Sequence, residues 1–427
     1  MKDPKVEHYD LVIVGGGLAG GLFLTALQHH HPHISTLLVE RSPQLGGNHT
    51  WCLHEGDIPE RSRPWFLPLL SHSWDRYEVF FPSHHRVLER SYHCLKSEDF
   101  AAKIASRCGS AATSKPTPPL IRLNSEVTGW KKDSDGETLL EIRGQGPTPV
   151  AASKPTLPVA ASKPTLVRCH SVIMAGGWQP LADPKSFGWQ KFVGLEVRLQ
   201  RPHDLRWPIL KDVRVPQIDG YRFFYTLPFS SDQLLIEDTY YSNHPGLRVE
   251  RIEREIYQYA ERQGWRIGEV LRRETGALPL AMNPPAMAVS EWPVLGAQSN
   301  YFHPVTGYTL PFTLRMIQDL MDHSNLTVPS MQKVMQLNFH RDERRFRFLA
   351  MLNRMMFLAA KSETRYRILE RFYRLPLPLI ERFYSGKVSL FDQIRILAGK
   401  PPVPLGAALK AVRRQTKVDE NSPAASP

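Results

Sequence analysis

The feature that most constrains this chain is a glycine-rich segment near its start, Gly15-Gly16-Gly17-Leu18-Ala19-Gly20. A short apolar run, residues 9–14 (YDLVIV), precedes it, and an amphipathic stretch, residues 22–30, follows it. These runs predict a strand and a helix. A second apolar run, residues 36–39, ends in Glu40, 20 residues after the last glycine. The order of strand, glycine turn, helix, strand and acid predicts a βαβ unit of a doubly wound parallel sheet.

The three spaced glycines each meet a physical need of dinucleotide binding. Gly15 permits the tight turn, Gly17 lets the backbone approach a pyrophosphate, and Gly20 lets helix and strand pack closely. The start of the helix adds amide donors and a positive dipole. Glu40 would accept hydrogen bonds from a ribose diol, and a carboxylate there favours FAD or NAD over NADP. We therefore predict a dinucleotide site, the alternative being a glycine-rich turn without a ligand.

Further glycines extend the predicted cofactor site. Gly46 and Gly47 begin the segment GGNHTW just past the acidic strand end, and in FAD proteins of this type such a segment lies beside the cofactor. An apolar run over residues 171–177 contains Gly176 near its end, as does a strand that re-enters a doubly wound sheet close to the cofactor. Gly307 lies in a turn before a predicted helix, where backbone amides can meet an anion.

The composition is that of a globular protein and excludes several classes. The 427 residues allow two or three domains, and 42% apolar with 22% charged residues exclude wholesale disorder. The mean hydropathy is −0.33, and no uncharged apolar run reaches the roughly 18 residues that a membrane span needs. Four cysteines without CxxC spacing predict neither a disulfide framework nor a zinc site, and we expect no metal. The first residues lack the pattern of a signal peptide, so we expect a cytoplasmic protein.

The fold class is predicted as α/β (α+β overall), with a Rossmann-type FAD-binding domain, an inserted β-sheet substrate cap and a C-terminal helical segment. The repeat VAASKPTL, at residues 150–157 and again at 159–166, buries nothing and indicates a loop expansion. The predicted parts are residues 1–110, 120–180 and 275–340 for the discontinuous FAD domain, 111–119 and 147–167 for low-complexity insertions, and 181–274 for the β-rich cap. Residues 341–415 are predicted as a basic helical segment that can form a membrane-docking face, and 416–427 as a disordered tail.

Two adjacent carboxylates, Glu237 and Asp238, stand inside an otherwise apolar strand of the cap. Side chains alternate across a strand, so the two acids point to opposite faces and one of them faces the packed side. Burial raises a carboxyl pKa, and a neutral carboxylic acid can donate a proton. The alternative is a structural ion pair, for which Arg222 on the neighbouring strand is a candidate. Alternation alone leaves both acids as candidates for catalysis.

An aromatic row precedes these acids. Tyr221, Phe223 and Tyr225 share one face of the neighbouring strand. Such a row can line a long apolar pocket and offer ring faces to a positive charge. The alternative is an ordinary core.

Nearly all of the net charge of +12 comes from the end of the chain. Residues 341–415 hold 17 Lys and Arg against 6 Asp and Glu, interleaved with Phe, Met and Leu. A basic, apolar-rich helical stretch suits an anionic membrane surface, and residues 341–358 are the candidate docking face. The alternative is a helical subdomain with a solvated basic face. No nucleic-acid-binding module accompanies the charge, so nucleic acid is not expected as a partner.

Several long blocks of the sequence together resemble one family. The blocks GGNHTW, GYRFFYTLP, LLIEDTYY, FHPVTGYTLP, MLNRMMFLAA and LAGKPPVP are similar to bacterial, flavin-dependent lycopene β-cyclases, and the resemblance runs from Tyr9 to Val412 without the repeat insertion. It implies an isomerase (intramolecular lyase) of carotenoid biosynthesis that closes β-ionone rings on lycopene, giving γ-carotene and then β-carotene. Reduced FAD is the implied cofactor, and NADPH is the implied electron donor.

The resemblance also implies roles for particular residues. It chooses Glu237 over Asp238 as the acid that protonates a terminal double bond or stabilises the resulting cation, and it assigns the spaced glycines and Glu40 to FAD. Because lycopene resides in a bilayer, it implies peripheral association with the inner face of the cytoplasmic membrane. Gly296-Ala297 stands where many related flavin hydroxylases carry Gly-Asp, which weakens that alternative. The remaining alternatives are an FAD- and NADPH-dependent hydroxylase or reductase of an isoprenoid, and a non-enzymatic carotenoid-binding protein; the oligomeric state stays open.

Overall fold

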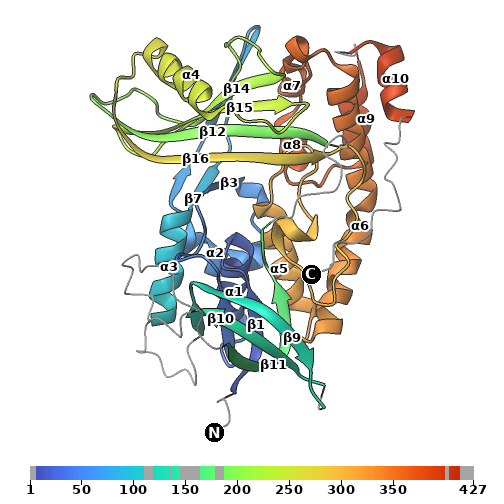
Figure 1. Cartoon of the computed structure of the whole chain (residues 1–427). Helices are drawn as coiled ribbons and strands as arrows, with labels where there is room; N and C mark the ends of the chain where they lie inside the picture. Colours follow the sequence, from blue (N-terminus) through green and yellow to red (C-terminus); the bar gives the residue numbers. More distant parts are fainter. Residues whose placement is uncertain are drawn as a thin grey trace.

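The computed structural model describes residues 6–109, 119–134, 136–144, 164–177, 187–399 and 403–413. Two sheets lie one above the other in Figure 1, with helices between them and along one side. The VAASKPTL copies and the predicted tail, residues 416–427, lie almost wholly outside the described residues. The end of the predicted insertion 147–167 is wrong, because a strand that pairs on both sides already begins at Thr165.

The lower sheet of Figure 1 carries the predicted βαβ unit. Its described strands lie in the order β8-β2-β1-β11-β10-β9. They are β1 (Glu7–Val14), β2 (Thr36–Val39), β8 (Leu120–Arg122), β9 (Ser125–Lys132), β10 (Thr138–Gly144) and β11 (Thr165–Met174). Strand β1 pairs in parallel with both β2 and β11. The predicted doubly wound core and the re-entry of the strand before Gly176 are confirmed.

Helices pack the lower half into one core. Helix α1 (Leu18–His30) begins directly after the glycine segment, and its Leu22, Phe23 and Leu24 are fully buried. Helices α2 (Arg63–Phe66) and α3 (Ser97–Gly109) contribute to the same apolar cluster. The start of α1 therefore lies at the carboxyl end of β1, where doubly wound folds bind their ligands.

The upper sheet forms the cap and has its described strands in the order β16-β12-β15-β14-β13-β5-β6. They are β5 (Tyr77–Phe81), β6 (His84–Leu88), β12 (Phe187–Leu199), β13 (Ile209–Asp212), β14 (Tyr221–Pro228), β15 (Gln233–Ser242) and β16 (Ile267–Ala281). Helix α4 (Val249–Arg262) covers the outer face of this sheet (Figure 1). The rings of Phe224 and Tyr259 stack there at 3.9 Å between centroids. The inner face looks toward the lower half (Figure 1), and part of it packs against the C-terminal residues 348–388.

The sheet topology departs from the predicted domain ranges at two points. Residues 77–88, which fall in the first range of the FAD domain, supply β5 and β6 of the cap sheet. Strand β16 continues to Ala281, beyond the predicted cap boundary at residue 274. The physical reason is that β5 pairs in parallel with β13, a contact between distant parts of the chain that alternation within each strand does not encode.

A small third sheet lies between the two halves. Its described strands are β3 (Thr50–His54), β7 (Tyr92–Lys96) and β4 (His72–Trp74), in that order. Strand β3 follows the Gly46-Gly47 segment directly. This sheet therefore connects the dinucleotide-binding half with the underside of the cap.

The C-terminal part is helical, as predicted. Its helices are α5 (Leu310–His323), α6 (Val328–Arg354), α7 (Tyr366–Phe372), α8 (Leu377–Tyr384), α9 (Leu390–Leu397) and α10 (Leu405–Arg413). A π-helical turn, Met355–Ala359, follows α6. Helix α6 runs beside both halves, and α7 to α10 gather near the cap (Figure 1). Within the described parts of the chain, no helix is both long enough and apolar enough to cross a membrane.

Most apolar side chains of the predicted docking face, residues 341–358, are not exposed to solvent, although Leu358 is 39% exposed. Phe346, Phe348, Leu349 and Phe357 are all buried in the cores of the two halves. For these four residues the apolar part of that prediction is wrong, because Phe346, Phe348 and Leu349 pack α6, and Phe357 the turn after it, against the rest of the protein.

Candidate functional site

The glycine turn has the close contacts that its sequence predicts. Gly15 has a φ of +111°, and a Cβ there would lie 2.6 Å from the carbonyl oxygen of Ala175. A Cβ on Gly20 would lie 1.9 Å from the carbonyl oxygen of Gly15. Both positions therefore admit only glycine, one for the turn and one for the packing of α1 on β1.

The middle glycine differs from its neighbours because it faces open space. A Cβ on Gly17 would meet no atom within 4 Å. Beside it, the backbone N–H of Gly16 donates to Glu40 Oε2 at 2.6 Å, and the backbone N–H of Ser42 donates to Glu40 Oε1 at 2.7 Å. Glu40 thus fixes the shape of the turn at the carboxyl end of β2. This open cradle at a helix start fits the pyrophosphate of a dinucleotide.

The other predicted cofactor glycines lie around the same edge. Gly46 and Gly47 have φ values of +78° and +68°, and the N–H of Gly46 donates to the carbonyl of Gly16 at 2.9 Å. Gly176 follows β11, and its Cβ position is 3.0 Å from Gln298 Oε1, a buried amide oxygen with no hydrogen-bond partner among the described residues. An unpartnered buried acceptor beside two open glycine segments fits a ligand that reaches past the turn.

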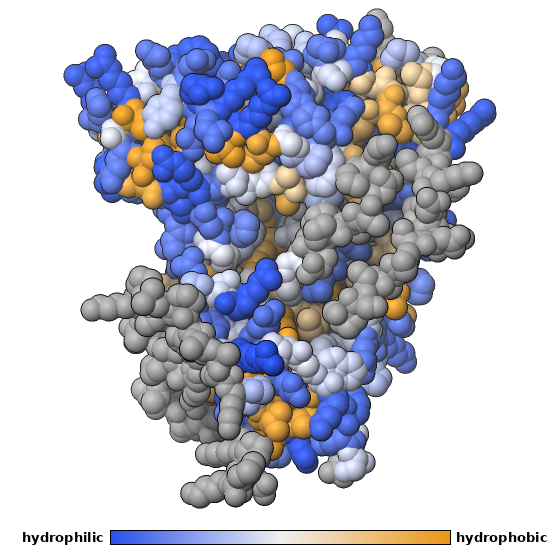
Figure 2. Space-filling view, in the orientation of Figure 1, coloured by the Kyte–Doolittle hydropathy of each residue, from blue (hydrophilic) through white to orange (hydrophobic). Residues whose placement is uncertain are grey.

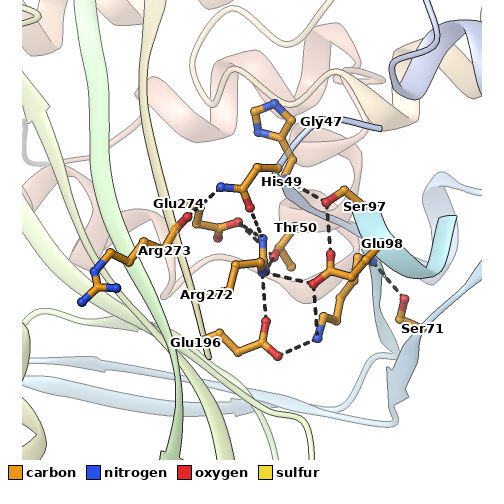
Figure 3. A network of polar contacts seen from close by, with 12 residues as sticks. Gly47, His49, Thr50, Ser71, Ser97, Glu98, Glu196, Arg272, Arg273 and Glu274 are labelled. Atoms are coloured by element: carbon orange, nitrogen blue, oxygen red, sulfur yellow. Dashed lines mark hydrogen bonds and ion pairs between the residues drawn. The ribbon is translucent and has the colours of Figure 1, made fainter. Parts of the chain in front are cut away.

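A polar network ties the Gly46–Thr50 segment to the cap (Figure 3). Asn48 donates from Nδ2 to the backbone carbonyl of Arg273 at 2.7 Å. Arg272 donates to Glu274 at 2.8 Å and to Glu196 at 3.0 Å. Figure 3 shows these side chains converging from β16, β12 and the segment before β3. The segment predicted to lie beside the cofactor is therefore held against the inner face of the cap sheet.

This network contains acids that the sequence did not single out. Glu196 and Glu274 are each only 4% exposed, and Lys96 donates to Glu196 at 2.6 Å. Burial raises the pKa of Glu274, although its ion pair with Arg272 lowers it. The sequence signal that could have identified Glu274 is alternation along β16, because residues two positions apart, such as Arg272 and Glu274, lie on the same face of a strand.

Glu237 projects from the inner face of the cap sheet, beside Glu274. In the strand register it pairs with Tyr225 on β14 and with Gly194 on β12, and Gly194 pairs in turn with Glu274 on β16. Gly194 leaves room between the two acids, since its own Cβ would come within 3.0 Å of the Glu274 side chain. Burial and the neighbouring Glu274 carboxylate raise the pKa of Glu237 to about 8. Near neutral pH this acid holds its proton.

Asp238 points the other way and is engaged in a structural contact. Arg222 donates to both of its carboxylate oxygens, at 2.9 and 2.7 Å, and both side chains are fully buried under α4. Tyr240 donates a third hydrogen bond to Asp238, and Glu255 of α4 accepts a further bond from Arg222. Of the two candidate acids, the structure places Asp238 in the ion pair that the sequence left as the alternative, away from the cofactor edge.

Tyr225, the cross-strand neighbour of Glu237, belongs to a cluster of tyrosines on the inner face. The hydroxyls of Tyr92 and Tyr225 lie 3.0 Å apart, and Tyr308 approaches Tyr92 at 3.4 Å. Tyr308 follows Gly307, whose φ is +68° and whose Cβ position is 3.1 Å from Leu278 of β16. The turn before α5 thus reaches the same strand as the Gly46–Thr50 segment. Between the two halves the surface is recessed, with apolar atoms visible at the bottom (Figure 2).

The aromatic row divides between core and site. Tyr221 and Phe223 are buried in the cap core, whereas Tyr225 keeps part of its surface accessible next to Glu237. Lys211, which the sequence did not single out, lies over the ring of Phe223 at 3.8 Å from Nζ to the ring centre. Burial lowers the pKa of Lys211 to about 7. The arrangement offers a carboxyl group with a raised pKa and aromatic rings on the face of the cap that is tied to the dinucleotide cradle.

Comparison with solved structures defines the class of the fold. The chain is similar to a geranylgeranyl bacteriochlorophyll reductase-like protein from Thermoplasma acidophilum, with a TM-score of 0.59 and 14% identity over 95% of this chain and 98% of that one. It is also similar to a flavin-dependent brominase, with a TM-score of 0.54 and 13% identity over 89% of this chain and 94% of that one. The fold is thus the Rossmann-type fold of flavin-dependent proteins.

Sequence comparison then gives the family. The family described as "Lycopene cyclase protein" matches residues 10–410. The lycopene beta-cyclase of Pseudescherichia vulneris is 39% identical, covering 94% of this chain and 96% of that protein. The lycopene beta-cyclase of Pantoea ananas is 37% identical, covering 95% and 98%. The chain belongs to the lycopene cyclase family.

Proposed function

We propose that this protein is a lycopene β-cyclase that closes the two ψ ends of lycopene in turn, giving γ-carotene and then β-carotene. The single observation that carries the proposal is the position of Glu237, a carboxyl group with a raised pKa that lies beside Tyr225 and across Gly194 from Glu274, the acid bonded to Thr50 next to the dinucleotide cradle. The relatives that match nearly the whole chain support the substrate class. In this proposal the lower half holds the cofactor and the cap holds the carotenoid.

FAD is the proposed cofactor, and Gly15, Gly17, Gly20, Glu40 and the Gly46-Gly47 segment would hold it. When bound and reduced by NADPH, FAD supplies an electron-rich ring system that stabilises positive charge nearby. The open space at Gly17 and the unpartnered oxygen of Gln298 support this assignment. Gly176 and Gly307 border the same space from the β11 end and from the turn before α5.

In the proposed reaction the protein supplies a proton and shields a cation. Glu237 donates its proton to a terminal carbon–carbon double bond of the substrate, and the resulting carbocation is attacked by the next double bond as the ring closes. The ring faces of Tyr225 and Tyr308 stabilise the positive charge while the recess excludes water. Loss of one proton sets the β double bond, so the product is an isomer of the substrate. Asp238 acts in this proposal only as the partner of Arg222.

Cofactor consumption separates this proposal from the alternatives. Purified protein with FAD, NADPH and lycopene is expected to form many rings for each NADPH oxidised, because the net reaction is an isomerisation. The measurement combines pigment chromatography with NADPH absorbance. A hydroxylase or reductase would instead oxidise one NADPH per product, and a carotenoid carrier would return lycopene unchanged.

The cyclisation rate is expected to fall as the pH rises through about 8, where Glu237 loses the proton that it must donate. The negative charge of Glu274 helps to hold that proton. Glu274→Gln should therefore lower the pKa of Glu237 and move this descending limb to lower pH by about one unit. Initial rates across pH, with substrate in detergent, test both statements. A limb that stays in place in the variant would show that Glu274 does not act on the proton donor.

Alanine substitutions at Gly17 and Gly20 are expected to have different effects. Gly17→Ala should lower flavin affinity at least tenfold and leave the fold intact, because its Cβ enters open space where the pyrophosphate would lie. Gly20→Ala should instead reduce the free energy of unfolding by about 3 kcal/mol, because its Cβ meets a backbone carbonyl. Flavin titration and denaturant unfolding measure the two effects. Equal flavin binding by Gly17→Ala and the wild type would contradict the cradle.

A further inference from the structure

Exposed apolar side chains gather on the C-terminal helices. Of the 11 large apolar residues that are exposed among the described residues, six lie between Leu358 and Leu409. Figure 2 shows hydrophobic atoms at the upper right, where Figure 1 places α7 to α10. A concentration of this kind on one part of a soluble fold marks an interaction surface.

Helix α9 carries the centre of this patch on one side. Leu390, Phe391 and Ile394 are 72%, 78% and 65% exposed, and Leu397 is exposed beside them. At about 100° per residue these four side chains fall within an arc of roughly 120°. The helix therefore turns a continuous apolar face outward.

The inward side of α9 is firmly held, because Ile396 packs against the apolar cluster of the cap and the C-terminal helices, and an ion pair to the buried Asp392 lies beside it. Asp392 is 1% exposed and accepts hydrogen bonds from Arg382 of α8 at 2.7 and 2.6 Å. Ser389 completes a capping box with Asp392 at the start of the helix. The Arg382 guanidinium beside Asp392 holds the pKa of that carboxyl at about 2. These contacts fix the orientation of α9, so its apolar face is held outward by the fold and does not result from fraying of the helix.

The charge around the patch is strongly positive. Residues 361–413 contain 11 Lys and Arg against 4 Asp and Glu. Lys387 and Arg395 are exposed directly beside the apolar face of α9, and Lys410 and Arg413 are exposed on α10. An apolar face with a basic border matches the interface of a bilayer that contains anionic lipids.

The patch is one helix removed from the site. Helix α8 presents Arg382 to α9, and it presents Tyr384 to the interior, where the Tyr384 and Tyr308 rings lie 6.0 Å apart. A membrane on the outer side of α9 would therefore be separated from Tyr308 by α8 and α9. A hydrocarbon substrate would then cross little water between the bilayer and the site.

We infer that the outward face of α9, formed by Leu390, Phe391, Ile394 and Leu397 and bordered by Lys387 and Arg395, docks the protein on anionic phospholipid membranes. The inference rests on the proposed function in so far as the bilayer holds the substrate. It moves the apolar part of the docking face from residues 341–358 to α9, because Phe346, Phe348, Leu349 and Phe357 are internal.

The test compares two double variants of the full-length protein. Phe391→Gln/Ile394→Gln removes the apolar face, and Tyr257→Gln/Leu337→Gln removes two exposed apolar residues elsewhere. Sedimentation with vesicles of phosphatidylcholine plus phosphatidylglycerol, and of phosphatidylcholine alone, measures the partition coefficient. The α9 variant is expected to bind the anionic vesicles at least tenfold more weakly than the wild type and the control. Wild-type binding should be stronger to anionic vesicles and should weaken with salt.

Two results would contradict the docking inference, and the measurements distinguish them. Equal partitioning of the α9 variant and the wild type would overturn the inference. So would a wild-type dimer that becomes a monomer in the α9 variant with vesicle binding unchanged, since the face would then bind a second copy. Cyclisation of lycopene in detergent micelles, measured in parallel, should be equal in all three proteins. Failure of the wild type in that assay would count against the proposed function and leave the docking result standing.

Discussion

Glu237→Gln is expected to lower the rate of ring closure by about 10²–10⁴-fold, the usual contribution of a positioned general acid. Glutamine keeps the size and polarity of the side chain but has no proton of useful acidity. The burial that raises the pKa of Glu237 to about 8 supplies the donor near neutral pH. Pigment chromatography with detergent-solubilised lycopene measures the rate. Glu269→Gln, on the exposed part of β16, is the matched control and should retain full activity.

The same variant should be more stable than the wild type in alkali. Between the ordinary glutamate pKa of about 4.3 and the folded value of about 8, the unfolded chain releases a proton that the folded protein keeps. The stability of the wild type therefore falls as pH rises through this window. Glutamine removes the penalty, so the free energy of unfolding at pH 9 should rise by about 1–3 kcal/mol. Loss of activity together with loss of stability would instead indicate a structural role for Glu237.

Asp238→Ala is expected to reduce the free energy of unfolding by about 3–5 kcal/mol, although Asp238 neighbours the proposed acid. The variant leaves the fully buried guanidinium of Arg222 with Glu255 as its remaining carboxylate partner. Removing one member of a buried pair is more destabilising than removing both, because the buried guanidinium loses both hydrogen bonds to Asp238 and keeps only one carboxylate partner. Denaturant unfolding measures the loss.

A double variant separates structure from chemistry at this pair. Arg222→Met/Asp238→Leu replaces both charges with apolar side chains and should recover most of the stability lost in Asp238→Ala. Any folded fraction of either variant should still cyclise lycopene, since Asp238 lies on the face under α4. A fully stable Asp238→Ala protein without activity would contradict the purely structural role of Asp238 and indicate that this residue acts in catalysis.

The parts of the fold that were predictable are those encoded locally. The βαβ unit follows from glycines whose missing Cβ atoms are required by contacts within a short stretch of chain, such as Gly20 against Gly15. The pairing of β5 with β13 was missed because it joins residues more than 120 positions apart, and neither strand carries a signal for its partner. The basic C-terminal helices were predicted from charge, but which of their faces is apolar and outward depends on packing.

The candidate site shows the same division. Strand alternation predicts that Glu237 and Asp238 face opposite ways, and the structure confirms this, yet alternation cannot say which face is covered by α4. Glu274 and Arg272 could not be predicted as site residues, because their role depends on the pairing of three strands that places Gly194 between Glu237 and Glu274. Their proximity to Asn48 depends on how the cap lies on the dinucleotide half.

Isotope uptake tests the central claim most directly. The protein is incubated with lycopene in D₂O under anaerobic conditions, with FAD reduced by dithionite and without NADPH, and the carotenoids are analysed by mass spectrometry. A proton-initiated isomerisation predicts γ- and β-carotene that gain one deuterium per ring, because each ring takes up a solvent-derived proton and loses one of its own. Rings without deuterium, or products that gain oxygen or two hydrogens, would contradict proton donation by Glu237 and a redox-neutral cyclisation.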